Sequence, residues 1–301
     1  MSRDDRPGDP AFRPASLGYR ENKVVALAEV CFLEDENSEV GLIGISVHPD
    51  CRRRGIGTAM LRAALPESRA RGCRVLESWQ VVAGTAGQFW AEGRGFTTVR
   101  MIVRQALVVA GTDRSLWDVE APAGYRLQRW IGVAPDDVID SYAVARGAIH
   151  DAPLGQSDYR WPEWTVERVR AAEAEWRQQG IEQWVVIAIH EKTGAVAGFT
   201  EVCVHPRRPD WGYQRDTAVP SAFRGRGLGR CIKACMLRWL VSDCPALERI
   251  STTTGADNSR MIRVNREVGF ASLRTMVAVQ QDLVAVESRM ADRDGPAKAT
   301  Q

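Results

Sequence analysis

The chain has 301 residues, 26% of them charged, and a formal net charge of only +2. So small a charge provides no overall field to attract nucleic acid or a membrane surface. The sequence contains no run of about 18 apolar residues that could span a membrane. Its first residues are charged and rich in proline, unlike a secretory signal. We therefore expect a cytoplasmic protein of about two domains, without a nucleic-acid or membrane partner.

The cysteines and histidines are not spaced like a disulfide framework or a metal site. The seven cysteines are odd in number and include no Cys-x-x-Cys. The four histidines show no ligand spacing, and two of them precede prolines in turns. We expect free thiols and no bound metal.

The chain repeats itself at a constant offset. The stretch AEVCFL begins at Ala28 and TEVCVH begins at Thr200, an offset of 172 residues that also relates Val47 to Val219. Self-similarity of this kind indicates two related domains in tandem.

The two copies differ in completeness. The first, at 1–110, runs out of chain where its hairpin should start, so it lacks residues for a first strand and two early helices. A linker follows at 111–123, where GTDRS and APAG are turn-forming. The second copy, at 124–285, is complete. The residues at 286–301 are charged and small, and we expect them to be disordered.

In chain order, the second copy alternates strand-like and helix-like segments. Pro135 with two following aspartates starts one helix, and Thr165 caps another that stops at Gly180. Alternating or continuous apolar runs predict the strands. The predicted strands are 124–132, 183–191, 195–204, 213–219, 249–255 and 274–283, and the predicted helices are 135–150, 165–180, 229–242 and 259–269.

A glycine-rich turn between a strand and a helix is built to hold an anion. Gly225, Gly227 and Gly229 let the backbone approach a ligand closely, and the helix N-terminus that follows adds partial positive charge. Flanking arginines suit phosphate. Arg230 stands where a P-loop needs lysine and where a Rossmann turn needs its third glycine, so neither motif fits. A basic helix cap without a ligand is the alternative.

These residues resemble a known family, the GCN5-related N-acetyltransferases. The spacing Arg-x-x-Gly-x-Gly of the family's motif A begins at Arg224, after the strand that ends near Val219. It also begins at Arg52 in the first copy, after Val47. The stretch NSRMIRVNREVGF, at 258–270, resembles motif B.

The resemblance implies an α+β fold of two tandem domains. Each would be a mixed, mostly antiparallel twisted sheet flanked by helices, with the first domain truncated at its N-terminus. It also implies acetyl-CoA as the co-substrate, with the pyrophosphate on the turn. The residues that it assigns to acetyl-CoA are Ala218, Val219, Arg224, Gly225, Arg226, Gly227, Leu228, Gly229, Arg230, Asn258 and Asn265. A second molecule could bind the first copy at Val47, Arg52, Arg53, Arg54, Gly55, Ile56, Gly57 and Thr58.

Acetyl transfer to an amine needs an oxyanion donor, a base and a group for the leaving thiolate. By the resemblance, the backbone amide of Val219 donates to the thioester carbonyl. Glu201 lies in an apolar strand and is our first candidate base, with a solvent-facing edge position as the alternative; Asp216 is the second candidate. Asn265 occupies the position where motif B often has a tyrosine that protonates the thiolate. Asparagine cannot give up a proton, so the acid stays unassigned.

The acceptor side is expected in the loop at 150–164. Asp151 could hold a cation, and Tyr159 and Trp161 an apolar face; a surface loop with aromatic anchors is the alternative. We expect a monomer or homodimer that acetylates the primary amine of a small molecule. A CoA-binding protein without turnover and a peptide or protein acceptor stay open. The first copy is expected to be a structural partner that can still carry CoA.

Overall fold

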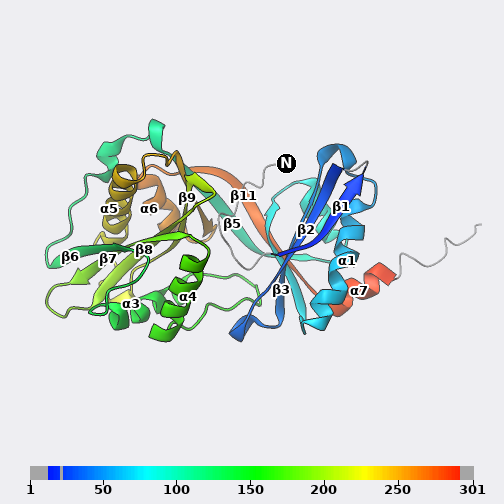
Figure 1. Cartoon of the computed structure of the whole chain (residues 1–301), viewed down its shortest axis with the longest axis horizontal. Helices are drawn as coiled ribbons and strands as arrows, with labels where there is room; N and C mark the ends of the chain where they lie inside the picture. The colour runs from blue at the N-terminus through cyan, green and yellow to red at the C-terminus, as the bar shows by residue number, and fades with distance from the viewer. Residues whose placement is uncertain (1–12, 21–22, 292–301) are drawn as a thin grey trace, which may run out of the picture.

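The computed structural model describes residues 13–20 and 23–291, which form one continuous sheet of 11 strands flanked by helices (Figure 1). The strand order is β1-β2-β3-β4-β11-β5-β10-β9-β8-β7-β6. Neighbouring strands are antiparallel except for the pairs β3–β4 and β9–β10, which are parallel. The expected α+β fold with a mixed, mostly antiparallel sheet is therefore confirmed.

The strands are β1 (Arg13–Arg20), β2 (Lys23–Phe32), β3 (Val40–Val47), β4 (Val75–Val82), β5 (Thr97–Val108), β6 (Tyr125–Ile131), β7 (Glu182–His190), β8 (Val196–His205), β9 (Arg208–Ala218), β10 (Arg249–Gly255) and β11 (Ala271–Asp282). The α-helices are α1 (Ile56–Ala70), α2 (Ala86–Glu92), α3 (Ile139–Arg146), α4 (Val166–Gln178), α5 (Leu228–Asp243), α6 (Ser259–Glu267) and α7 (Leu283–Ala291).

Local sequence explains the central elements of the second half. The strands β7 and β8 are almost continuously apolar because helices cover both of their faces. The side chain of Thr165 caps α4 by accepting a hydrogen bond from the Arg168 amide at 3.2 Å. The helix α5 begins after Gly227, whose φ of 78° is a left-handed conformation that glycine adopts without strain.

The two halves exchange their last strands. The strand β5 ends the first half but pairs with β10 of the second, while β11 ends the second half and pairs with β4 of the first. The two strands also pair with each other along their length. In Figure 1 they cross together between the lobes. Each half therefore obtains one of its strands from the other.

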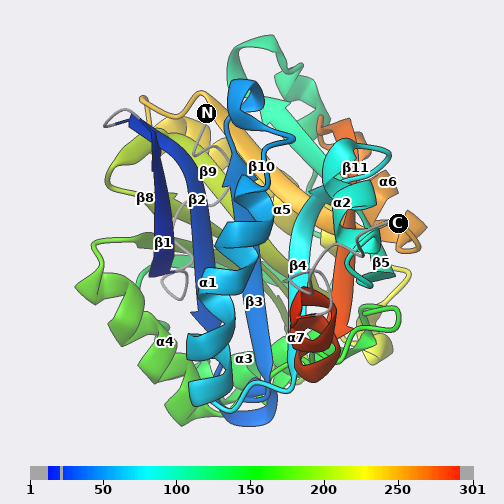
Figure 2. The ribbon, with the colours of Figure 1, turned by 90° about the vertical axis from the view of Figure 1, so that its right-hand side faces the viewer.

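The helix α7 corrects the prediction of a disordered tail at 286–301. Val286 and Met290 are buried in the core cluster of the first half, together with residues of α1. Figure 2 shows α7 beside α1. These buried apolar side chains order residues 286–291. The rest of the predicted tail, at 292–301, lies outside the described residues.

Among the described residues of the first half, no counterpart of α3 or α4 covers the sheet face opposite α1. In the second half α3 and α4 cover the face that carries Phe199 and Glu201. The corresponding residues of β2, Leu27 and Glu29, are half-buried. Among residues 13–20 and 23–291, no helix is both long and apolar enough to cross a membrane.

A loop of the second half docks on that face instead. The Ser157 hydroxyl lies 2.8 Å from both carboxylate oxygens of Glu77 on β4. Backbone groups of Arg160 exchange two hydrogen bonds with the Asn37 side chain, at 2.8 and 2.9 Å. Arg168 pairs with Glu36 at 2.9 Å, and its guanidinium lowers the pKa of that carboxyl to about 2. The segment following α3 thus joins the halves.

Candidate active site

The turn before α5 leaves room for a ligand at its glycines. A Cβ placed on Gly225 or Gly227 would meet no atom within 4 Å, and one on Gly229 would meet only Val219 Cγ2, at 4.0 Å. The first amides of α5 have no partner within the helix, and Gly227 provides no side-chain cap. Open space, unpaired amides and the helix dipole fit the pyrophosphate of a CoA molecule.

The arginines of the turn are already engaged. The Arg224 Nε donates to the Val219 carbonyl at 2.9 Å, and its terminal amine pairs with Asp151. The Arg226 side chain donates to the Tyr125 hydroxyl. Arg224 therefore braces the turn in this structure. Arg230 lies half-buried in the first turn of α5, where its Nε is buried and has no hydrogen-bond partner among residues 13–20 and 23–291.

A wedge opens in the sheet directly before this turn. The strand β9 pairs with β10 only from Trp211 to Tyr213, while β10 continues along β5 as far as Gly255. The remainder of β9 diverges from β10 and leads to Val219 and the glycine turn. The predicted residues Ala218 and Val219 lie at the end of this diverging segment, so the structure brings them together with the turn.

A bulge in β9 places Asp216 at this divergence. Thr200 of β8 faces Thr217, but Val202 faces Gln214, so β9 has one residue more than its neighbour. Asp216 lies within the bulge, and its side chain is 26% exposed. A bulge of this kind redirects side chains and is common beside active sites.

Glu201 is buried, so the alternative of a solvent-facing edge residue is wrong. Its carboxylate accepts a hydrogen bond from the Tyr142 hydroxyl and lies 3.4 Å from the guanidinium of Arg146. The same guanidinium reaches Asp216 at 3.8 Å. Burial raises the pKa of Glu201, and Arg146 partly opposes that rise. The two predicted carboxylates therefore share one buried cation.

Tyr142 and Arg146 were missed by the sequence reasoning. Both lie on α3, and both side chains are fully buried against β8. The Arg146 guanidinium also stacks over the Trp164 ring, with 3.3 Å between its carbon and the ring centroid. Arg146 follows Tyr142 by four residues, which places both on one face of the helix, and this spacing was the available signal.

The two asparagines of the motif B segment have structural partners. The Asn258 side chain caps α6 by accepting from the Met261 amide at 3.1 Å. Asn265 is fully buried, and its amide donates to Gln105 of β5 at 2.8 Å. Neither contact involves the turn, so their roles toward acetyl-CoA remain predictions.

The three predicted acceptor residues have different contacts. Asp151 pairs with Arg224 beside the turn. Tyr159 packs edge-on against Trp79 of the first half, with ring centroids 5.0 Å apart, and against Trp161. The Trp161 indole donates to the Ala152 carbonyl at 3.0 Å. Tyr159 and Trp161 thus hold the loop in place, and of the three only Asp151 contacts a residue of the glycine turn; their roles toward an acceptor stay predictions.

Comparison with protein-family models shows to which family the chain belongs. The model of the acetyltransferase (GNAT) family matches residues 3–96 and 154–270. The chain belongs to the GNAT acetyltransferase family. It is an acyltransferase, and the family draws its acetyl group from acetyl-CoA.

Individual relatives agree with the GNAT assignment. The chain is 28% identical over 239 residues to the mycothiol acetyltransferase of Mycobacterium avium, covering 75% of this chain and 69% of the relative. It is 29% identical over 242 residues to that of Mycolicibacterium gilvum, covering 78% and 72%. Among solved structures, a tandem GNAT protein from the clavulanic acid biosynthesis pathway aligns with a TM-score of 0.69 at 24% identity, over 88% of this chain and 81% of that one. That likeness confirms the tandem GNAT fold.

The first GNAT half keeps the brace of the turn. Arg52 Nε donates to the Val47 carbonyl at 3.0 Å, as Arg224 does to Val219. Arg53 stands in the left-handed conformation, φ 62°, where the second half has Gly225. An arginine is strained there by about 1 kcal/mol.

The anion-binding side of the first turn is partly filled. A Cβ on Gly57 would lie 3.5 Å from the indole of Trp90, whereas the equivalent Gly229 faces open space. The Arg94 guanidinium stacks on that indole at 4.3 Å and donates to Thr58. The other predicted residues, Arg54, Gly55 and Ile56, lie on the turn and the start of α1.

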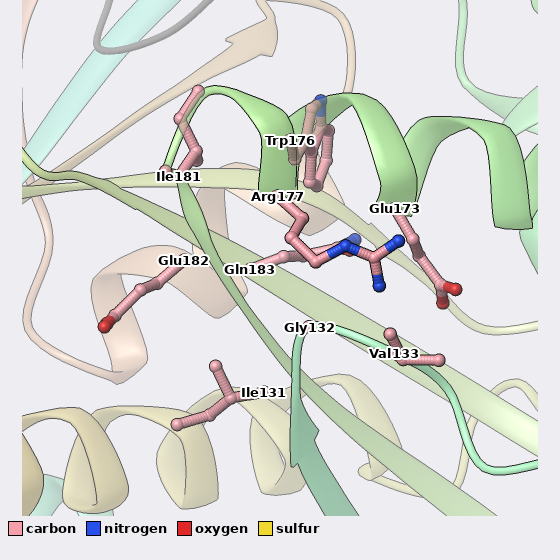
Figure 3. A pocket seen from close by; sticks show the side chains of 10 residues that line it. Ile131, Gly132, Val133, Glu173, Trp176, Arg177, Ile181, Glu182 and Gln183 are labelled. Atoms are coloured by element: carbon pink, nitrogen blue, oxygen red, sulfur yellow. The ribbon is translucent and has the colours of Figure 1, made fainter.

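A shallow pocket lies elsewhere in the second half. Its volume is about 240 Å³, and it lies between the end of β6 and the end of α4, where Ile131, Trp176 and Gln183 line it (Figure 3). None of the site residues described above lines it. Among residues 13–20 and 23–291, no group of three His, Cys, Asp or Glu side chains is placed to hold a metal ion.

Proposed function

We propose that the second half transfers the acetyl group of acetyl-CoA to the primary amine of a small molecule, by direct attack of the amine on the thioester. The main support for this proposal is that three features lie next to one another. The divergence of β9 from β10 leads into a glycine turn with open space, and the bulge in β9 holds a half-buried carboxylate, Asp216, at the same place.

In this proposal the glycine turn holds the diphosphate. The amides of Gly225 to Arg230 and the N-terminus of α5 supply the positive potential, and Arg230 adds a donor whose Nε has no partner among the described residues. Acetyl-CoA supplies the activated acetyl group when it is bound. The amide of Val219, at the end of the diverging strand, donates to the oxygen that becomes negative.

Asp216 is the group best placed to take the proton of the acceptor. An amine reaches the enzyme mainly as an ammonium, whose pKa is near 10, so a carboxylate must hold it and remove a proton, directly or through water. Asp216 is accessible, whereas Glu201 is enclosed by Tyr142 and Arg146. We therefore assign Glu201 an indirect role: it fixes Arg146, which in turn orients Asp216.

Two observations favour a small acceptor: the position of the loop that follows α3 and the names of the relatives. The loop that follows α3 is fastened to the first half by the contacts of Ser157, Arg160 and Arg168, so it lies across this end of the molecule. The relatives at 28–29% identity carry the name mycothiol acetyltransferase. We take from that name only the size class of the acceptor, a small molecule; that its acetylated group is a primary amine is part of our proposal.

The proposal is tested by incubating the full chain with acetyl-CoA and a panel of amines. The panel contains amino sugars, amino acids, polyamines, cysteine conjugates and lysine-containing peptides. Release of free thiol above the rate of hydrolysis, with the acetylated amine identified by mass spectrometry, is the expected result for at least one small amine. Transfer to the peptides alone would exclude a small acceptor, and hydrolysis alone would exclude amine transfer.

A further inference from the structure

The β-bulge that carries Asp216 exists only in the second half. Between β2 and β3 the pairing runs without interruption from Ala26 with Val47 to Phe32 with Gly41. The corresponding pair β8 and β9 has a register shift between Thr200 and Val202. The pairing of β9 therefore includes one more residue than that of β8, and the two halves of the same chain allow a direct comparison with and without a bulge.

A buried polar network lies beneath this bulge. The Gln214 side chain donates to the Thr200 hydroxyl at 2.9 Å and to the backbone carbonyl of Glu201 at 2.6 Å, and it lies 3.4 Å from the Thr217 hydroxyl. Thr200 and Thr217 pair on one side of the register shift, Glu201 lies within it, and Gln214 pairs with Val202 on the other side. Gln214 thus connects the strands across the point where their ladder is interrupted.

Lys233 of α5, the helix that packs on this face of the sheet, is the last member of the network. Its Nζ donates to Gln214 Oε1 at 2.9 Å, and its side chain is 1% exposed. Among the described residues this amine forms no ion pair, and the nearest ring, that of Phe270, is 5.2 Å away. The Gln214 amide is held on its oxygen side by Lys233 and on its nitrogen side by β8.

The first half has an apolar core at the same positions. The registers align Gln214 with Ile43, and the offset of 172 aligns Lys233 with Leu61 and Thr200 with Ala28. These three first-half residues are buried. Leucine and isoleucine would fill such a core at less cost than a lysine without a carboxylate partner. The polar network is therefore expected to make the second half less stable than an apolar core at the same positions would. It lies at the same place as the bulge.

We propose that Gln214 and Lys233 are positioning residues that hold the bulge of β9, so that Asp216 faces the cleft and Val219 ends the strand in the correct register. This inference rests on the proposed function of the second half. Neither side chain touches a substrate. They act on the backbone of residues 214–217: the Gln214 side chain bonds across the shift to Thr200 and Glu201, and Lys233 holds the Gln214 side chain in place.

The test replaces the network by the residues that the first half uses. The double variant Gln214→Ile/Lys233→Leu removes both long polar side chains together. The Thr200 hydroxyl keeps its contact with Thr217 at 2.7 Å, while the Glu201 carbonyl loses one donor. We expect its Tm to equal or exceed that of the parent, its kcat to fall about tenfold or more, and its Kd for acetyl-CoA to stay within about twofold. Amide hydrogen exchange at residues 214–217 should become about tenfold faster.

Two further variants control for effects on folding. Lys233→Met keeps the volume of the side chain but removes its donor, and it should lower kcat in the same way. Leu240→Ala truncates a buried residue of α5 outside the network; it should lower the Tm and leave kcat within about twofold. A merely structural role for the network would give the opposite pattern, with a lower Tm and an unchanged kcat.

Failure of the inference can be separated from failure of the proposed function. A double variant with the kcat and the amide exchange of the parent overturns the positioning role. If the parent itself transfers acetyl to no amine, the proposed function is wrong. Exchange at residues 214–217 then decides the positioning role alone, and an unchanged exchange rejects it.

Discussion

The Asn265 side chain of α6 donates a hydrogen bond to Gln105 Oε1 of β5 across 2.8 Å. The two residues come from different halves of the chain, and both are fully buried. The strand β5 also borders β10, one of the two strands that form the candidate cleft. The first half therefore contributes a strand and a buried side chain to the structure around the site in the second.

Because the halves exchange strands, we expect neither to fold alone. A fragment of 1–110 lacks β11 and α7, which supply Val277, Val286 and Met290 to its core. The remaining fragment lacks β5, whose Leu107 is fully buried in the core of the second half. Each fragment expressed alone should give an insoluble product or a disordered circular dichroism spectrum, whereas co-expression should restore a soluble complex. A folded, monomeric second half would contradict this prediction.

A carboxylate at Gly229 should abolish binding of acetyl-CoA to the second half. In Gly229→Asp the new side chain would occupy the open space of the turn and repel phosphate, and it requires no left-handed backbone. The matched variant Gly57→Asp alters the first turn, where Trp90 already lies. We expect turnover to fall more than about a hundredfold in the first variant and less than about threefold in the second.

Calorimetry with acetyl-CoA shows which sites remain in each Gly229 or Gly57 variant. If Gly57→Asp removes turnover and Gly229→Asp does not, the active half has been assigned to the wrong copy.

The sequence predicted the repeat and the glycine turns because both depend on residues close together in the chain. A fixed offset and the φ requirement of glycine can be read without a structure. The strand exchange could not be predicted, because β4 and β10 each offer an edge and local patterns do not say which distant strand will occupy it. The helix α7 was missed for a related reason: Val286 and Met290 become a helix face only through contacts with a half that lies about 200 residues earlier.

The candidate site was predicted only in part. Glu201 and Asp216 are brought together, but the cation between them, Arg146, lies 55 residues before Glu201. The unusual position of Lys233 could have been noticed in the sequence, because the offset of 172 aligns this lysine with the apolar Leu61. Only burial distinguishes a lysine in a core from one on the exposed face of a helix.

Removal of the accessible carboxylate should cost more activity than removal of the buried one. Asp216→Asn deletes the group that we assign to proton removal, and kcat/KM should fall about a hundredfold or more. Glu201→Gln keeps the shape and a hydrogen bond for Tyr142 but frees Arg146 to pair with Asp216 alone, so we expect a fall of about tenfold. Steady-state rates from pH 6 to 10 measure both. A larger loss in Glu201→Gln would return that residue to the role of base.

Lys233 should make stability depend on pH. Burial lowers the pKa of Lys233 to about 7, below its ordinary value of 10.5. Between these two values the unfolded chain binds more protons, so the free energy of unfolding should rise as the pH rises from 7 toward 10. If the pH rises by about 2 units in this range, the free energy of unfolding should increase by about 3 kcal/mol.

The dependence on pH is measured as urea midpoints at pH 7 and pH 9. Lys233→Met removes the titrating group and should flatten the difference between the two midpoints. Glu201, whose pKa is raised by burial, acts at lower pH, where stability should fall as the pH rises above the ordinary carboxyl value of 4.5. A parent protein with equal midpoints at pH 7 and 9 would contradict the assignment to Lys233.

The exchange of β5 and β11 determines when the first half can finish folding during synthesis on the ribosome. The strand β4 must wait for its partner β11, which follows about 200 residues later in the chain, or about 10–40 s at ordinary rates of translation. During that interval β4 has an unpaired edge, a place where β-strands of other chains could add. The nascent first half is therefore most exposed to aggregation in the period before release, and chaperones that bind ribosome-associated chains would have their greatest effect on this half.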